Sequence, residues 1–394
     1  GINCTYGRDD RVFEAVQSLN AAFKDKKIET VKVVLAENFS IGTYMGDAAL
    51  FCLRNVLGSY KLDSLVLKDI HQIGDLTVAE TKIEGARDSN TQIVLNQQYQ
   101  ILRVELFDKL YGVNRDQVAE EVATIPFEVQ DGFIILTVTV NNDKQRLRFL
   151  FDTGADGMMV SPGLAERIGL KINKEQQASV VGGHINIKVS ADNSVFLGDF
   201  ELTHQSIAIF ENISLEYDGI IGNTITKKYI THIDYDKKIT VLYSLGRFVS
   251  ENAEMKVPVS VSTGNILIPA VLKMNENKPI HGKFAFDTGA GYHLIVFRPT
   301  VLKYRMLVDG FVQDSVGSTI SMGISTPVFH GKAKSISFNK DWQIRDFPVT
   351  LMGKGGGTMS WIPQADGSLG SKFIDGYNFT INLVDKYIYF QKRG

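Results

Sequence analysis

The sequence contains one five-residue motif twice. Residues 151–155 and residues 286–290 both read Phe-Asp-Thr-Gly-Ala, and apolar residues precede and follow each copy. A carboxylate placed in an apolar strand is costly to bury unless the fold uses or pairs the charge. Two copies with the same Thr-Gly after the acid therefore indicate that Asp152 and Asp287 are brought together as a pair. This requirement constrains the architecture, because two separate halves of the chain must meet where the motifs lie.

The repeat extends beyond the two motifs. A segment that begins with proline opens each unit, at Pro126 and at Pro258. A segment of the form Asp-Gly-x-x-Gly follows each motif, at residues 218–222 and 366–370. The runs between them are short, rich in Val, Ile and Phe, and broken by Gly, Asn and Asp, which is typical of strands and turns. A repeat of this length predicts two similar β lobes that each supply one aspartate.

The length predicts several domains, because 394 residues exceed what one compact core normally holds. The first 124 residues have a different pattern from the rest, with helical apolar periodicity followed by longer alternating stretches. The helical segments are expected at 11–23, 30–35 and 47–57, and the strands at 65–70, 76–83 and 92–106. We therefore expect an α+β domain at residues 1–124, a first β lobe at 125–247 and a second at 252–394.

Composition excludes several classes of function. The formal net charge of −2 argues against nucleic acid as the main partner. No apolar run approaches the roughly 18 to 20 residues of a membrane span. No cluster of His and Cys has metal-ligand spacing, and no Gly-rich loop ends in Lys-Ser or Lys-Thr. Neither a metal nor another cofactor is expected.

On these motifs, residues 125–394 resemble aspartic peptidases of the retropepsin and pepsin kind, and look like two retroviral-like lobes fused in tandem, as in bacterial proteins. The resemblance implies an all-β, two-lobed fold with closed barrel lobes, and endopeptidase activity on peptide or protein substrates. It implies that a water molecule between Asp152 and Asp287 is activated without a metal. Since both lobes lie on one chain, a monomer is expected. The resemblance also implies an extracytoplasmic location.

The residues around each aspartate have expected supporting roles. Gly154 and Gly289 allow a tight turn and a close approach of the opposite lobe. The resemblance implies that Thr153 and Thr288 form hydrogen bonds across the lobe interface, since a hydroxyl donates and accepts at once. It also implies that the segments 220–222 and 368–370 pass behind the two loops. In the second of these segments, Ser368 stands where an apolar residue is expected.

The resemblance further implies a hairpin flap over the substrate. Residues 180–185 read Val-Val-Gly-Gly-His-Ile and place Gly182 and Gly183 at the tip of such a hairpin in the first lobe. Residues 316–324 lie in the corresponding region of the second lobe.

Both motifs have alanine after the glycine, at Ala155 and Ala290. In the acid-stable eukaryotic members this residue is commonly Ser or Thr, whose hydroxyl donates to the carboxylate and favours its ionised form. The loss of that hydrogen bond raises the pKa values of the pair. We therefore predict that activity is highest at mildly acidic pH.

The first 124 residues resemble the nuclear-transport-factor-like and SnoaL-like cone fold, including a Phe-Ser-Ile-Gly stretch at residues 39–42. Such a domain is either a docking module or a ligand site lined by Tyr44, Asp69 and His71. Two alternative functions follow for the whole chain. One is a catalytically silent peptide-binding protein, for which Ser368 is the supporting departure, because a serine beneath the loop would loosen Asp287. The other is a ligand-binding function of the N-terminal domain.

Overall fold

The computed structural model describes residues 7–85, 90–180, 183–211, 216–321, 324–355 and 363–394. The chain divides into two compact units. The first unit comprises residues up to Ala119 together with Leu245–Phe248 and Ser260–Thr263, and the second comprises Glu120–Ser244, Val249–Val259 and Gly264–Gly394. The finer division of the second unit at residues 247 and 252 stays a prediction.

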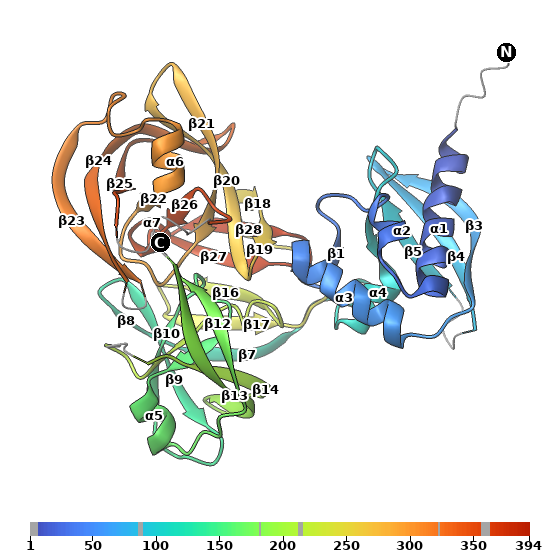
Figure 1. The fold of residues 1–394 in the computed structure, drawn as a ribbon, viewed down its shortest axis with the longest axis horizontal. Helices are drawn as coiled ribbons and strands as arrows, with labels where there is room; N and C mark the ends of the chain where they lie inside the picture. Colours follow the sequence, from blue (N-terminus) through green and yellow to red (C-terminus); the bar gives the residue numbers. More distant parts are fainter. Residues whose placement is uncertain (1–6, 86–89, 181–182, 212–215, 322–323, 356–362) are drawn as a thin grey trace. The chain divides into compact units, whose positions relative to one another are not determined.

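The N-terminal unit combines helices with a four-stranded antiparallel sheet (Figure 1). Its helices are α1 (Arg8–Asp25), α2 (Glu29–Lys32), α3 (Gly46–Ser59) and α4 (Glu105–Leu110). Its sheet has the strand order β3 (Ser64–Ile73), β4 (Leu76–Glu84), β5 (Asn90–Leu95) and β6 (Ile101–Val104). A separate two-stranded ribbon consists of β1 (Ser40–Ile41) and β2 (Tyr44–Met45). The cone-fold assignment for this unit stays a prediction.

The helices expected at 11–23 and 47–57 are confirmed, the segment expected at 30–35 is helical only up to Lys32, and one expected strand is wrong. α1 buries Val12, Val16 and Leu19 completely, as its apolar periodicity predicts. The stretch 92–106 is not continuous, because β5 and β6 are separated by a turn and a helix begins at Glu105. The side chain of Asn96 closes that turn, since its Oδ1 accepts hydrogen bonds from the backbone N–H groups of Gln98 and Gln100. Asn is a frequent turn residue for this reason.

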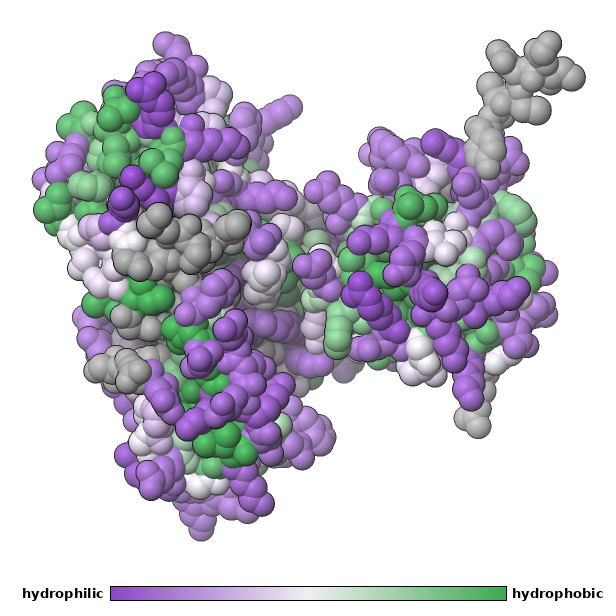
Figure 2. Space-filling view, viewed as in Figure 1, coloured by the Kyte–Doolittle hydropathy of each residue, from purple (hydrophilic) through white to green (hydrophobic). Residues whose placement is uncertain are grey.

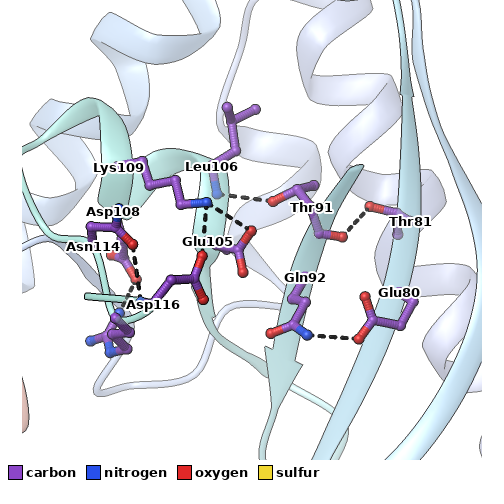
Figure 3. Close-up of polar contacts among 11 residues, drawn as sticks. Glu80, Thr81, Thr91, Gln92, Glu105, Leu106, Asp108, Lys109, Asn114 and Asp116 are labelled. Atoms are coloured by element: carbon purple, nitrogen blue, oxygen red, sulfur yellow. Dashed lines mark hydrogen bonds and ion pairs between the residues drawn. The ribbon is translucent and has the colours of Figure 1, made fainter. Parts of the chain in front are cut away.

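Polar groups in the N-terminal unit are largely paired with one another (Figure 3). Asp108 is buried and accepts hydrogen bonds from the backbone N–H of Gly42 and from Arg115. Its burial raises the pKa of the Asp108 carboxyl, an effect that Arg115 opposes. Of the three candidate ligand-lining residues, His71 contacts Glu80, Asp69 is exposed on β3, and Tyr44 packs against the ring of Tyr111. A ligand site lined by these three residues stays a prediction.

The second unit contains two closed β-barrels with equivalent strand connections (Figure 1). The first barrel has the order β13 (Gly183–Leu197), β14 (Phe200–Ile209), β11 (Met158–Val160), β15 (Gly219–Ile221), β10 (Leu147–Phe151) and β9 (Phe133–Val140), and β9 pairs back to β13. The strands β8 (Glu128–Gln130) and β12 (Lys174–Val180) extend it, and α5 (Pro162–Arg167) follows β11.

The second barrel repeats this order. It runs β24 (Ile324–Asn339), β25 (Trp342–Met352), β22 (Leu294–Val296), β26 (Gly367–Leu369), β21 (Lys278–Phe286) and β20 (Asn265–Asn275), and β20 pairs back to β24. Further elements associated with it are β23 (Gln313–Ser321), α6 (Arg298–Lys303) and α7 (Ser371–Ile374), whereas β19 (Ser260–Ser262) belongs to the residues of the first unit. The internal repeat of the sequence thus corresponds to a repeat of strand topology.

A six-stranded antiparallel sheet joins the two barrels. Its order is β18 (Met255–Pro258), β28 (Tyr387–Lys392), β27 (Tyr377–Asn382), β16 (Ile230–Asp234), β17 (Ile239–Tyr243) and β7 (Glu121–Pro126). The two halves meet where β16 pairs with β27, for example at Ile233 and Phe379. Phe379 also packs edge-on against Phe286, with a centroid separation of 5.0 Å. This sheet therefore anchors the strand that leads into the second motif.

Apolar side chains on the surface of this unit gather around α6 and the start of β23 (Figure 2). Leu302, Val308 and Val312 are among the exposed hydrophobic residues there, and Val316 and Ile320 continue along β23. In the part of the chain that the structure describes, no helix combines the length and the apolar character that crossing a bilayer requires.

Candidate active site

Each aspartate follows directly after a buried central strand of its barrel. β10 ends at Phe151 and β21 ends at Phe286, and both phenylalanines are almost completely buried. Each strand pairs in parallel with the segment predicted to pass behind the loop, β10 with β15 and β21 with β26. The backbone N–H of Asp152 donates to Ile221 and that of Asp287 donates to Leu369, both at 2.9 Å. Equivalent hydrogen bonds therefore fix the start of both loops.

The two loops are locked together by their threonines. The hydroxyl of Thr153 donates to the carbonyl of Phe286 at 2.6 Å, and the hydroxyl of Thr288 donates to the carbonyl of Phe151 at 2.8 Å. Each hydroxyl also accepts from the backbone N–H of the other threonine, at 3.0 and 3.1 Å. Both threonines are buried. The network uses each hydroxyl as donor and acceptor and sets one separation for the two loops.

Gly154 and Gly289 let the opposite carboxyl group come close. A Cβ atom on Gly154 would lie 2.5 Å from an oxygen of Asp287, and a Cβ on Gly289 would lie 2.5 Å from an oxygen of Asp152. The backbone N–H of each glycine donates to the aspartate of its own loop, at 2.9 and 3.0 Å. Glycine is therefore required by contact at both positions, and the predicted tight loops bring Asp152 and Asp287 face to face.

Two glycines behind the loops have the same kind of constraint. A Cβ on Gly222 would lie 2.9 Å from the carbonyl oxygen of Asp152, and a Cβ on Gly370 would lie 2.8 Å from that of Ala290. The segments 220–222 and 368–370 therefore pack directly under the loops, as the sequence predicts.

Burial and mutual repulsion shift the pKa values of the carboxyl pair. Both side chains keep partial access to solvent, but protein atoms surround them closely. Loss of hydration is the main cause that raises the pKa of Asp152 well above its ordinary value, and the neighbouring Asp287 raises it further. Burial also raises the pKa of Asp287, against hydrogen bonds from Asp152, Gly289 and Ser368 that lower it. The pair is thus suited to hold one shared proton.

Ser368 makes a contact with the carboxyl pair that the sequence analysis did not foresee. Its position in β26 suggested a loosened support for Asp287, but its hydroxyl lies 3.3 Å from Oδ2 of Asp287 and donates to that oxygen. Tyr292 lies beside Ser368 and interacts with its hydroxyl, and burial raises the pKa of the Tyr292 phenol. The only sequence signal for this contact was the polar residue inside an otherwise apolar strand.

Asn223 is a second supporting residue that sequence reasoning missed. Its side-chain amide donates to the carbonyl of Thr153 at 2.7 Å and to that of Gly264 at 2.9 Å. Its own Oδ1 accepts a hydrogen bond from Thr226. Asn223 is buried and lies two residues after the end of β15. The available sequence signal was therefore a polar residue close to the end of a buried apolar strand.

The predicted flap is described only in part. β12 and β13 pair antiparallel as far as Val180 and Gly183, so a hairpin lies where the sequence predicts one and Gly183 begins its second strand. Gly182 lies outside the described residues. β23 and β24 form the corresponding antiparallel pair of the second barrel as far as Ser321 and Ile324, and residues 322–323 lie outside the described residues. The role of either hairpin as a flap stays a prediction.

Comparison with known proteins adds one finding to this geometry. A family model described as aspartyl protease matches residues 136–225. That segment resembles an aspartyl protease. It contains the first motif, β10 and β15, and therefore the strands that hold Asp152. No curated protein matches the chain. The match covers less than half of the chain and does not include the second barrel, which has the same strand order as the first.

Proposed function

We propose that residues 125–394 form a two-lobed aspartic endopeptidase with Asp152 and Asp287 as its catalytic pair. The observation that carries the proposal is the reciprocal threonine network between two identical motifs, because it holds two carboxyl groups in contact at the junction of two equivalent barrels. The aspartyl protease match over residues 136–225 supports the same class of hydrolase.

The pair can hydrolyse a peptide bond by direct attack of water. The ionised carboxylate takes a proton from the water while the water oxygen bonds to the carbonyl carbon of the substrate. The protonated partner gives its proton to the carbonyl oxygen, which produces a neutral tetrahedral diol. In the second step the carbon–nitrogen bond breaks. The nitrogen receives the proton held by the first carboxyl group, and the second carboxylate recovers a proton from one hydroxyl of the diol. The products are a carboxylic acid and an amine, and the pair returns to its starting state.

The retention of both acids and both threonines favours hydrolysis over peptide binding alone. A protein that only binds peptides needs neither the shared proton nor two carboxyl groups kept in a costly, partly dehydrated contact. Ser368, which departs from the apolar residue expected beneath the loop, was the one feature that favoured a catalytically silent protein. Its hydrogen bond to Asp287 gives this serine a role that hydrolysis can use. A location outside the cytoplasm remains a prediction from the resemblance.

The pH dependence of hydrolysis tests the proposal. The active form holds one proton, so activity falls in acid as the pair gains a second proton and falls in alkali as it loses the first. Because burial raises the pKa values of Asp152 and Asp287, the acid and alkaline limbs of the pH profile both move to higher pH. We expect kcat/KM on a peptide substrate to be highest at mildly acidic pH. A profile that peaks below about pH 3 would contradict this account of the site.

Activity should not depend on dimer formation, since one chain supplies both carboxyl groups. We expect the initial rate per molecule to stay constant when the protein is diluted about 100-fold in the assay, because no association step of the kind that makes activity concentration-dependent is required. A specific activity that falls on dilution, together with dissociation seen in sedimentation, would show instead that two chains build the site.

A further inference from the structure

The two aspartates have different surroundings, although their loops are equivalent. Ile220 of β15 lies beside Leu150, the second residue before Asp152, and Ser368 of β26 lies beside Ala285, the second residue before Asp287. The two strands thus place one residue in the same register beneath each loop. In the first barrel this residue is apolar and packs with Ile135 and Leu150. In the second barrel it is a serine in contact with the carboxyl group.

The loop of Asp287 also contains a hydroxyl that the loop of Asp152 lacks. Residues 288–293 connect the second aspartate to β22 and include Tyr292, whereas residues 153–157 connect the first to β11 and include no tyrosine. The Tyr292 hydroxyl interacts with Ser368. The Ser368 hydroxyl donates to Oδ2 of Asp287 at 3.3 Å. Since a serine hydroxyl has one proton to donate, its contact with Tyr292 leaves it the acceptor.

We propose that Ser368 is a positioning residue that makes the pair asymmetric, with Asp287 as the ionised member and Asp152 as the holder of the shared proton. This inference rests on the proposed function and assigns the two roles within it. Asp287 accepts the proton of the attacking water, and Asp152 donates to the carbonyl oxygen of the substrate. During breakdown of the diol, Asp287 protonates the leaving nitrogen and Asp152 recovers its proton.

Burial is the largest influence on the pKa of Asp287 and raises it, whereas the hydrogen bonds to its carboxyl group all act in the opposite direction. The hydroxyl of Ser368 and the backbone N–H groups of Gly289 and Gly154 donate to it, and each favours its charged form. Asp152, facing it across the interface, serves as a further donor when protonated. Burial raises the pKa of Asp152 most and the neighbouring Asp287 raises it further, while the N–H of Gly154 is the one hydrogen bond, among the described residues, that lowers it. Tyr292 stays protonated, because burial and the charge of Asp287 raise the pKa of its phenol.

The first test compares pH profiles of kcat/KM for the wild type and Ser368→Ala. Removing the donor disfavours ionised Asp287, so we expect the acid limb to move upward by about one pH unit. At any pH below the acid limbs of both the wild type and the variant, this shift lowers kcat/KM of the variant about tenfold. Ser368→Thr, which keeps a hydroxyl, should restore the wild-type limb. Ser335→Ala is the matched control, because Ser335 is a buried serine of β24, outside the two loops and the strands that support them. An unchanged acid limb in Ser368→Ala would overturn the proposal.

The second test does not need catalysis. Aspartate carboxyl carbons are labelled with ¹³C and titrated by NMR, and the signals of the pair are assigned from Asp152→Asn and Asp287→Asn. We expect the first proton lost from the pair to leave Asp287, and Ser368→Ala to move that step upward by about one pH unit. If Asp152 loses its proton first, the inference is wrong whether or not the protein cleaves peptides. If the expected titration is seen in a protein that cleaves nothing, the proposed peptidase function fails and the asymmetric pair stands.

Discussion

Replacing either aspartate of the pair with asparagine is expected to abolish peptide hydrolysis. A neutral amide in place of Asp287 cannot take a proton from water, and an amide in place of Asp152 cannot act as the acid toward the carbonyl oxygen of the substrate. Loss of a general acid or base lowers the rate by about 100- to 10,000-fold. The measurement is kcat/KM for Asp152→Asn and Asp287→Asn on one peptide at the pH optimum. Activity within about tenfold of the wild type in either variant would exclude the pair as the catalytic centre.

The same substitutions should not unfold the protein. The pKa values of both aspartates are raised above the unfolded value of about 3.9. The folded state therefore binds protons more tightly, and this stabilisation is present at low pH and lost as the pH rises through the folded pKa values. At neutral pH an uncharged amide avoids the cost of a buried charge, so the variants should melt at the wild-type temperature or above it. Asp192→Asn, on the exposed surface beside His204, is the control and should retain full activity.

Thr288→Val is expected to destabilise the second unit and to slow hydrolysis. Valine has the shape of threonine but leaves the carbonyl of Phe151 and the N–H of Thr153 without their buried partner. Two such losses cost about 2 to 4 kcal/mol of unfolding free energy. Since the loops are then no longer held at one separation, kcat should fall by up to about 100-fold. Urea unfolding followed by tryptophan fluorescence, to which Trp342 in the second barrel contributes as a buried residue, measures the first effect.

The matched control for this prediction is Thr231→Val. Thr231 is also completely buried, but its hydroxyl donates to the nearby carbonyl of Tyr229 within the six-stranded sheet and does not join the two loops. The Thr231→Val variant should be less stable than the wild type without the loss of kcat that is expected for Thr288→Val. Thr288→Ser, which keeps the hydroxyl, should retain most of the activity. If the valine variants at 288 and 231 behave alike, the network between the loops has no special role in positioning the pair.

The sequence predicted the two aspartates and their loops because the physical requirements there act on residues that are neighbours in the chain. A tight turn with a close neighbour needs the glycines at 154 and 289, and a reciprocal lock needs the hydroxyls of Thr153 and Thr288. These demands act on residues next to the acids, so they leave a repeated motif. The helices around Val12 and Leu53 were predictable for a similar reason, since burial of one face imposes a period on the chain.

Other features depend on contacts between distant residues and left weaker signals. The direction in which Ser368 points is set by the pairing of β26 with β21, so the sequence alone suggested a defect where the structure has a donor to Asp287. Asn223 ties the loop of Thr153 to Gly264, a contact that spacing does not encode. In the N-terminal unit, one alternating pattern continued through the Asn96 turn and into a helix, because period-two alternation does not mark where a strand stops.

The most direct test of the central claim is cleavage of a mixed peptide library by the whole protein between pH 3 and 8, with the products identified by mass spectrometry. We predict new peptide termini that are most abundant at mildly acidic pH, that fall at least about 100-fold with Asp287→Asn, and that decrease when pepstatin is added. No cleavage at any pH by a folded wild-type protein, or cleavage by the Asp287→Asn variant within about tenfold of the wild-type rate, would contradict the assignment of Asp152 and Asp287 as a peptide-hydrolysing pair.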